Sequence, residues 1–249
     1  MERGLNKRWM GALFAVLITL SFGLVFNAVQ SNTISLAFEN AFGTNRLMIG
    51  LAMAAAFAVI IFGGVKRIAK MSEYIVVVLA VLYIGIAAYV VIVNIGQVPA
   101  VLTLIVKSAF GFEQVAGGSL GAALMQGVKR GLFSNEAGMG SAPNAAATAT
   151  TSHPVKQGLM QALGVLVDTL LICTSTAMII LLSGVSTGSG MGGIELTQAA
   201  LSVHIGSWAS GFLAIMVFLF AFSTLIGNYY YGETNIAFLK SNKIWINIY

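Results

Sequence analysis

Long apolar runs separated by short polar connections dominate the chain. From Trp9 to Phe38 the sequence contains no Asp, Glu, Lys, Arg or His. Because a helix needs about 20 mainly apolar residues to cross the hydrocarbon core, this run predicts a long, tilted transmembrane helix. Similar runs give about six crossings and an all-α integral membrane protein. The predicted spans, within one membrane domain at 1–249, are residues 9–38, 47–65, 74–95, 117–150, 157–183 and 208–231.

The fourth run differs from the others because a polar segment interrupts it. From Gly131 to Pro143 it reads Gly-Leu-Phe-Ser-Asn-Glu-Ala-Gly-Met-Gly-Ser-Ala-Pro. Backbone groups cannot stay unpaired against lipid, so such a segment must line protein or a water-filled cavity. Transporters use broken helices of this kind to present backbone groups to ions and small solutes. The alternative is that the small residues only allow close helix packing. The neighbouring Asn135 and Glu136 favour a solute site.

The composition supports the membrane class and excludes several functions. Hydrophobic residues make up 58% of the chain and charged residues 8%, against roughly 25% charged residues in soluble domains. The net charge of +5 comes from basic residues in short loops, which argues against nucleic-acid binding. Cys173 has no cysteine partner, and His153 and His204 lie far apart, so we expect no disulfide, no metal cluster and no cofactor. We also expect no enzyme and no channel, because the sequence shows neither a nucleophile with its base nor a filter segment.

The basic residues predict that the N-terminus lies in the cytoplasm. In that orientation the outer loops hold only Arg46 and Lys107, as the positive-inside rule requires. Lys129 and Arg130 fall outside this scheme, directly before the broken segment, where a polar vestibule would hydrate them. A signal peptide is disfavoured because the first apolar run exceeds the about 7–15 residues of such a segment. The cytoplasmic positions collect Arg3, Lys7, Arg8, Lys66, Arg67, Lys70, Lys156, Lys240 and Lys243.

Three blocks of sequence carry a family resemblance. The first is Gly131–Ala145, with Lys129 and Arg130 before it and Thr148–Pro154 after it. The second is 225–235, reading Leu-Ile-Gly-Asn-Tyr-Tyr-Tyr-Gly-Glu-Thr-Asn, and the third is 27–34, reading Asn-Ala-Val-Gln-Ser-Asn-Thr-Ile. Together they resemble the alanine or glycine:cation symporter family, the sodium-coupled amino-acid carriers. The resemblance implies part of a leucine-transporter-like inverted-repeat fold.

The resemblance also implies that the chain is a piece of a carrier. The broken span matches the sixth core helix of that fold, so the chain would contain core helices three to eight. It would lack the N-terminal and C-terminal helices, and the family's chains are longer. In the family the broken first helix supplies much of the substrate and ion site, so a truncated, transport-incompetent fragment is an alternative to an active carrier.

A substrate of this family is a zwitterion. Half-helix N-termini and backbone N–H groups suit its carboxylate, and carbonyl or amide oxygens suit its ammonium. Gly138, Gly140 and Ser141 allow close backbone approach, and Pro143 lacks an N–H where the next half-helix would start. With the resemblance added, the expected substrate-binding residues are Gln30, Phe133, Asn135, Gly138, Gly140, Ser141 and Asn228.

Two of these positions have structural alternatives. Gly23, Asn27, Gln30 and Ile34 recur at helical spacing, which places them on one face of the first span. The amides of Asn27 and Gln30 either hold helices together, for about 0.6–2 kcal/mol, or face the solute, as the resemblance implies for Gln30. Phe133 either packs within the protein or closes a lid over the substrate.

Candidate ion-binding and carboxylate groups lie in the last three predicted spans. Ser223 and Thr224 match the position where this fold places side-chain oxygens for a coupling sodium ion; the alternative is bonding to their own helix. Glu136 and Asp168 are possible coupling or structural carboxylates. Asp168 lies within an apolar run, where a carboxylate is costly, so we expect it to pair with Lys129 or Arg130, to serve the coupling ion or to be protonated. His153 and Pro154 predict a helix boundary.

The expected function is sodium-coupled symport of a small neutral amino acid, alanine or glycine, by alternating access. The expected partners are the amino acid, Na+ and the lipid bilayer, and the expected location is the plasma (inner) membrane. Proton coupling and a D-amino acid substrate stay open at this stage.

Overall fold

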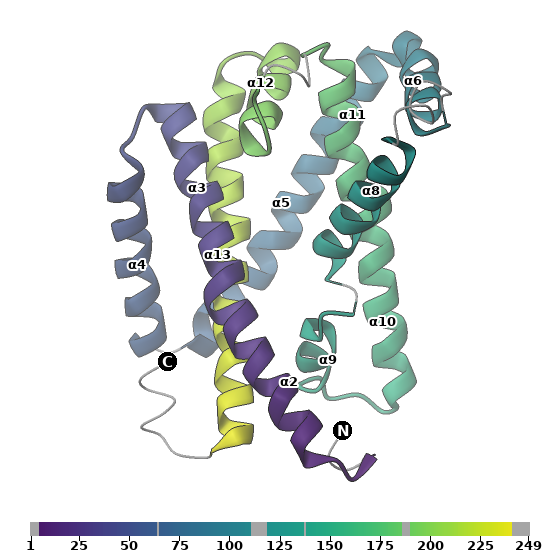
Figure 1. Cartoon of the computed structure of the whole chain (residues 1–249). Coiled ribbons are helices and arrows are strands. Elements are labelled where there is room, and N and C mark those ends of the chain that lie inside the picture. Colours follow the sequence, from purple (N-terminus) through teal and green to yellow (C-terminus); the bar gives the residue numbers. More distant parts are fainter. Residues whose placement is uncertain (1–4, 64, 111–118, 137, 186–189, 241–249) are drawn as a thin grey trace. The chain divides into compact units, whose positions relative to one another are not determined.

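The computed structural model describes residues 5–63, 65–110, 119–136, 138–185 and 190–240. Within these ranges every regular element is helical, as the apolar runs predict. The chain forms two compact units: Met1–Val78 together with Trp208–Tyr249, and Leu79–Ser207. We call them the first unit and the second unit; their helices are labelled in Figure 1.

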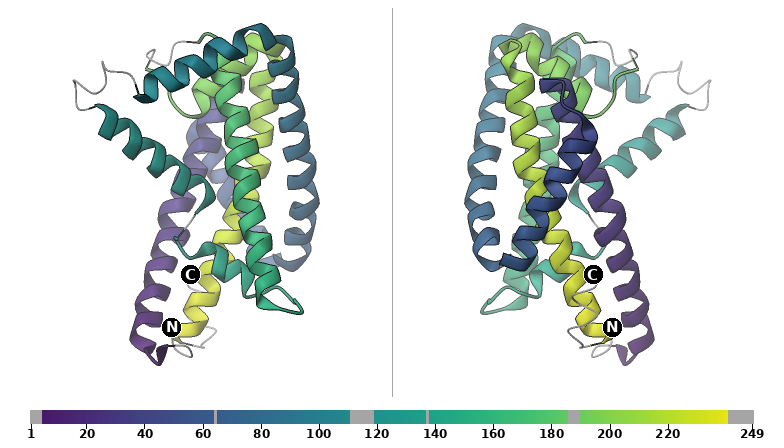
Figure 2. Two further views of the ribbon diagram at one scale, coloured as in Figure 1. Left: turned by 90° about the vertical axis from the view of Figure 1, so that its right-hand side faces the viewer. Right: turned by 90° about the vertical axis from the view of Figure 1, so that its left-hand side faces the viewer.

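The first apolar run forms one continuous helix that contains a π-helical turn. The helix α2 (Arg8–Leu20) passes through η1 (Ser21–Phe26) into α3 (Asn27–Phe42), and both views of Figure 2 show no gap along this stretch. The chain leaves α3 at Gly43, whose φ of 65° is left-handed and costs glycine little. The π turn therefore lies directly before Asn27 and contains Gly23, two of the residues that the sequence places on one face.

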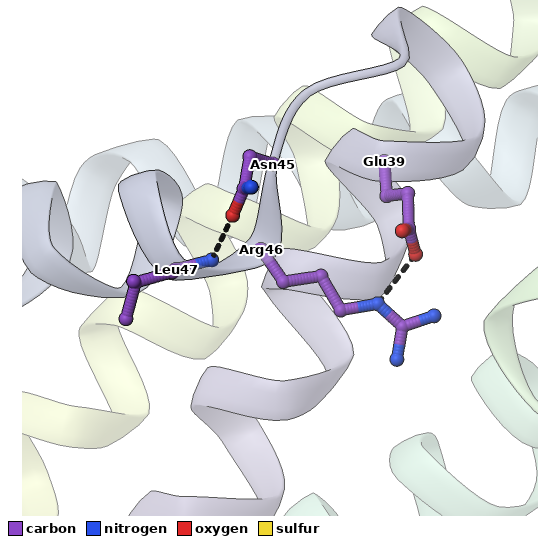
Figure 3. Close-up of polar contacts among 4 residues, drawn as sticks. All are labelled: Glu39, Asn45, Arg46 and Leu47. Atoms are coloured by element: carbon purple, nitrogen blue, oxygen red, sulfur yellow. Dashed lines mark hydrogen bonds and ion pairs between the residues drawn. The ribbon is translucent and has the colours of Figure 1, made fainter.

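Polar contacts fix the turn between α3 and α4 (Arg46–Gly63), as Figure 3 shows. The guanidinium of Arg46 pairs with the carboxylate of Glu39, and both side chains are exposed. Asn45 caps α4, because its Oδ1 accepts a hydrogen bond from the N–H of Leu47 at 2.8 Å. An exposed ion pair contributes little by itself, whereas a cap of this kind contributes about 1 kcal/mol. The cap is therefore the stronger constraint on this hairpin.

The long helix α13 (Trp208–Leu239) packs along α2, η1 and α3 in the first unit. A Cβ placed on Gly11 would lie 3.1 Å from Cζ of Phe238, so α2 and α13 approach closely at that glycine. Small residues allow such approach between membrane helices. The apolar centre between α3, α4 and α13 consists of Ile34, Met53, Ala221 and Leu225.

The second unit begins within α5 (Val65–Val93), whose residues 79–93 belong to it. Its α8 and α9 are separate helices, whereas α10, the π-helical turn η3 and α11 form one continuous helix. The elements are η2 (Ile95–Gln97), α6 (Val98–Phe110), α8 (Ser119–Asn135), α9 (Ser141–Ala146), α10 (Pro154–Leu166), η3 (Val167–Cys173), α11 (Thr174–Leu182) and α12 (Ile194–Ile205).

The helix boundary predicted at His153 and Pro154 is where α10 begins. His153 is the N-cap residue, and its Nδ1 accepts a hydrogen bond from the N–H of Val155 at 3.2 Å. Pro154 takes the first helical position, where its missing N–H costs nothing. The sequence pattern therefore locates this helix start correctly.

Four described helices are long and apolar enough to cross a membrane: Arg8–Phe42, Val76–Val93, Pro154–Leu182 and Trp208–Leu239. They overlap the predicted spans 9–38, 74–95, 157–183 and 208–231. The predicted span 47–65 overlaps a shorter apolar helix, Arg46–Ile61. The fourth predicted span begins at Gly117, which lies outside the described residues, as do Arg3 and Lys243. A total of about six crossings stays a prediction.

Candidate functional site

The fourth apolar run contains an interruption of helical structure. The helix α8 ends at Asn135 and α9 begins at Ser141. Between them Glu136, Gly138 and Gly140 have φ angles of 52°, 78° and 98°. Glycine adopts positive φ freely, but Glu136 carries a Cβ that makes this conformation cost about 1–2 kcal/mol. Local strain of this kind is concentrated at functional sites, so the interrupted segment is the leading candidate for one.

Ser141, the first residue of α9, has an unsatisfied hydroxyl. Its side chain is 2% exposed, and its Oγ has no hydrogen-bond partner within the described part of the chain. Buried polar atoms are almost always paired, so an unpaired one marks a place where a polar ligand or water fits. Pro143 is the third residue of α9 and not the first; its missing N–H is harmless there because first-turn N–H groups have no intrahelical acceptor.

A polar cluster joins the end of α8 to the π-helical turn η3. The hydroxyl of Ser134 donates to Oδ2 of Asp168 at 2.6 Å and lies 3.1 Å from Sγ of Cys173. The amide of Asn135 donates to Oγ1 of Thr169 at 3.3 Å. These contacts all lie within the second unit. We call these residues the α8–η3 cluster: Ser134, Asn135, Asp168, Thr169 and Cys173.

The π-helical geometry of η3 explains why Asp168 and Cys173 meet the same hydroxyl. On an α-helix with 3.6 residues per turn, residues five apart point about 140° away from each other. A π turn closes i to i+5 and brings such residues onto one side. Because single π turns are frequently found at functional sites, the position of η3 beside the break supports the candidate site.

The ion pair expected for Asp168 is absent from the described residues. Lys129 and Arg130 are exposed, and no salt bridge of the described chain joins either of them to Asp168. The observed partner is the neutral hydroxyl of Ser134. The ion pair is therefore not seen in the described part of the chain, while a coupling-ion role and a protonated carboxylate for Asp168 stay predictions.

In the first unit, a buried amide pair connects α13 with the start of α3. Asn228 is 1% exposed, and its Nδ2 donates to Oδ1 of Asn27 at 2.7 Å. Asn27 in turn donates to the carbonyl of Gly23, in η1, at 3.0 Å. The role weighed from the sequence for Asn27, holding helices together, is therefore seen in the structure. Gln30, predicted to bind substrate, lies half-buried on α3 about one turn further along.

Ser223 and Thr224 lie at the midpoint of α13. Both hydroxyls donate to the carbonyl of Phe220, at 2.7 Å and 3.2 Å respectively. This is the local bonding that the sequence analysis gave as the alternative to an ion site. A hydroxyl that donates its proton to the helix keeps its oxygen lone pairs, so both oxygens can still coordinate a cation.

The predicted site residues are divided between the two units. Gln30, Ser223, Thr224 and Asn228 lie in the first unit, and Phe133, Asn135, Glu136, Gly138, Gly140, Ser141 and Asp168 lie in the second. Within the second unit the structure brings Asn135 and Asp168 into one cluster, whereas Phe133 is 42% exposed.

The sequence analysis missed Ser134 and Thr169 and treated Cys173 only as an unpaired thiol. Ser134 lies between the predicted residues Phe133 and Asn135 in the broken segment, so its position could have indicated it. The five-residue spacing from Asp168 to Cys173 could not, because residues five apart lie on one side of a helix only where it forms a π turn.

These features together define a class of protein. Helices long enough to cross a bilayer, a helix broken by left-handed residues and a carboxylate–hydroxyl cluster next to the break are typical of multi-pass membrane transporters. In the described part of the chain, no group of three or more His, Cys, Asp or Glu side chains is placed to hold a metal ion.

The chain belongs to the sodium:alanine symporter family, because the model of that family matches residues 1–249. The resemblance drawn from the three sequence blocks is thereby confirmed. Members of this family are transporters, so the protein is not an enzyme.

Similar proteins come from several bacteria. The chain is 75% identical over its full length to a probable sodium/glutamine symporter of Bacillus subtilis, covering 52% of that protein. It is 58% identical over its full length to an amino-acid carrier protein of the same organism, covering 53% of it. A sodium/proton-dependent alanine carrier of Bacillus sp. is 44% identical over 91% of this chain and 54% of its own length. The chain thus spans about half the length of the curated relatives it matches.

The amide pair leads to a prediction about stability. Asn27→Ala and Asn228→Ala should each destabilise the protein, and the double variant should lose less than the sum of the two. The expected coupling is about 0.6–1.7 kcal/mol, the range of hydrogen bonds between membrane helices. Equilibrium unfolding in mixed micelles measures all four forms.

The matched control is Asn32→Ala, an exposed amide on the same helix. It should show no coupling to Asn228→Ala. A coupling of zero between Asn27 and Asn228 would mean that their contact contributes nothing specific to the packing of α3 and α13.

Proposed function

We propose that this chain forms part of a carrier that moves a neutral amino acid across the membrane together with Na+, by alternating access. The observation that carries the proposal is the break between α8 and α9 in a chain that matches the family over its whole length. The leucine-transporter-like arrangement, with α8 and α9 as the broken sixth core helix, is part of the same proposal. So are a location in the plasma (inner) membrane and a cytoplasmic N-terminus.

The broken segment suits the polar ends of an amino acid. The left-handed residues Gly138 and Gly140 interrupt the helical path, and Ser141 adds a buried hydroxyl without a partner in the described chain. Such groups bind a carboxylate or an ammonium with little reorganisation. We assign substrate contacts to Gln30, Phe133, Asn135, Gly138, Gly140, Ser141 and Asn228, the last through its amide oxygen, since its Nδ2 bonds to Asn27.

The relatives bear on the choice of substrate. Glutamine, alanine and glycine share the charged backbone groups and carry no net charge, so the same broken helix suits all three. The relative with 75% identity is described as a probable sodium/glutamine symporter, whereas the alanine carrier is 44% identical. We therefore propose glutamine as the preferred substrate and keep alanine and glycine, expected from the sequence, as the alternatives.

Two places in the chain are proposed to serve the coupling ion. Ser223 and Thr224 offer hydroxyl oxygens at the midpoint of α13. Asp168 is the midpoint residue of the apolar helix Pro154–Leu182, where an ionised carboxylate costs about 2.5–3.5 kcal/mol unless a cation or donors compensate it. One serine hydroxyl supplies a single donor, so a cation is the natural further partner. Protons compete with Na+ for a carboxylate, and proton coupling is the alternative.

A chimera tests the carrier function directly. In this chimera, the chain replaces the matching 249 residues of the probable sodium/glutamine symporter of Bacillus subtilis. We expect proteoliposomes with the chimera to accumulate labelled glutamine several-fold above the level in choline medium when an inward Na+ gradient is imposed. Alanine and glycine should compete less well than glutamine.

The unmodified relative is the positive control, and the 249-residue chain alone shows whether this part suffices. A chimera that inserts and folds but accumulates no neutral amino acid under a Na+ gradient contradicts the proposal. If a pH gradient drives uptake and Na+ has no effect on it, the coupling ion is the proton and not Na+.

Removal of the α13 hydroxyls should weaken Na+ binding. In the chimera, Ser223→Ala or Thr224→Val should raise the Na+ concentration for half-maximal uptake about tenfold, which corresponds to about 1.4 kcal/mol. The KM for the amino acid at saturating Na+ should change much less. Thr234→Val is the matched control, because its hydroxyl bonds to the carbonyls of Tyr230 and Tyr231 on the same helix. Equal effects of Thr224→Val and Thr234→Val would show that only local helix bonding is lost.

Cys173 reports on Asp168 without any transport measurement. Its Sγ lies 3.1 Å from the hydroxyl that bonds to Asp168, and it is the single cysteine of this chain. If Asp168 binds Na+, then Na+ in place of choline should slow alkylation of Cys173 severalfold. Asp168→Asn should abolish this protection, whereas Glu195→Gln on α12 should retain it. Mass spectrometry of the Cys173 peptide measures the alkylation rate. An alkylation rate that is the same in Na+ and in choline would contradict binding of Na+ by Asp168.

A further inference from the structure

The chain contains two histidines, and both lie at helix ends in the second unit. His153 is the N-cap residue of α10. His204 lies in the last turn of α12, and its Nε2 is 3.0 Å from the carbonyl oxygen of Ile179 on α11. The two rings therefore face opposite poles of a helix, which gives protonation opposite consequences at the two places.

The cap made by His153 requires a neutral ring. Its Nδ1 accepts a hydrogen bond from the N–H of Val155. A protonated imidazole carries N–H groups at both nitrogens and has no acceptor left. Its positive charge would also lie at the positive end of the helix dipole. The usual N-cap residues Ser, Thr, Asp and Asn do not have this restriction near neutral pH.

The two described elements next to His153, α9 and the first turn of α10, offer no carboxylate to compensate such a charge. The first turn of α10 contains no acidic residue, and its Lys156 adds a positive charge that is directed to Oγ of Ser152 at 2.8 Å. The helix α9 packs against α10 and consists of Ser-Ala-Pro-Asn-Ala-Ala, which has no titratable side chain. Protonation therefore removes the cap without creating a new attraction from either element.

The contact made by His204 behaves in the opposite way. A carbonyl oxygen only accepts, so Nε2 of His204 must carry the proton in this contact, and both the neutral and the protonated ring keep it. Ile179 is one of the last four residues of α11, and the carbonyls of these residues receive no hydrogen bond from an N–H group within the helix. A positive charge is favourable at such a C-terminus.

We infer that His153 is a pH-sensitive cap on the connection between α9 and α10. Histidine is the side chain that changes its charge between about pH 5 and 8. The stability that the cap contributes is present when the ring is neutral and is lost as the pH falls and the ring becomes protonated. Acidification then weakens the start of α10, to which residues 147–153 connect the half-helix α9, while the His204 contact persists.

Hydrogen exchange of the folded protein tests this inference. Amide exchange at pH 7.5 and pH 5.5, corrected for the intrinsic rate at each pH, is compared for the peptide around Val155 and for the peptide around Ser183. Acidification should speed exchange around Val155 about fivefold, the effect of losing a typical N-cap. Exchange around Ser183, next to the His204 contact, should stay unchanged.

Two substitutions provide matched comparisons. His153→Asn caps the helix without titrating, so its exchange around Val155 should be slow at both pH values. His153→Ala lacks a cap, so its exchange should be fast at both. An equal corrected rate at the two pH values in the unmodified protein overturns the inference, as does an acid effect of the same size in His153→Asn. Because the readout is exchange and not uptake, the result does not depend on the proposed function.

Discussion

The pairing of backbone polar groups is the constraint on which this structure depends. In the interior of a bilayer no water replaces a missing helical hydrogen bond, so a helix can stop only where protein or a bound solute takes over. The chain stops a helix at Asn135 and starts the next at Ser141, with left-handed residues between them. Interrupting a helix in an otherwise apolar run is costly, because the peptide groups that leave helical bonding need protein, water or a solute as a partner. The proposal that this segment binds a solute rests on that balance.

The polar side chains of the apolar helices follow the same rule within each unit. In the first unit the amide of Asn228 donates a hydrogen bond to Oδ1 of Asn27, and the amide of Asn27 donates one to the carbonyl of Gly23. In the second unit the hydroxyl of Ser134 donates to the carboxylate of Asp168. Both contacts lie at π-helical turns, η1 and η3. The turns and the polar pairs thus occur together, since a π turn re-aims side chains that an α-helix would direct to different sides.

Much of this architecture could be predicted from the sequence. Long apolar runs predicted helices, the Gly/Ser/Pro segment predicted a break between Gly131 and Pro143, and His153 with Pro154 predicted the start of α10. These signals depend only on residues that are close together in the sequence, so they can be recognised without a structure. The partner of Asp168 could not be predicted, because charge favoured Lys129 or Arg130 whereas the observed hydroxyl of Ser134 depends on the rotation introduced by η3. The bond between Asn27 and Asn228 joins residues 201 positions apart, and no periodicity encodes such a contact.

The π-helical turn η1 also limits how the gene can change. A π turn accommodates one more residue than an α turn would, so losing any single residue from Ser21–Phe26 would convert the stretch to an ordinary α-helix. Because the π turn absorbs that residue without turning the helix further, the face that carries Asn27 would keep about the same direction relative to α2. Loss of one residue from within α2 itself has no such compensation and would rotate the preceding part of the helix by about 100° relative to Asn27.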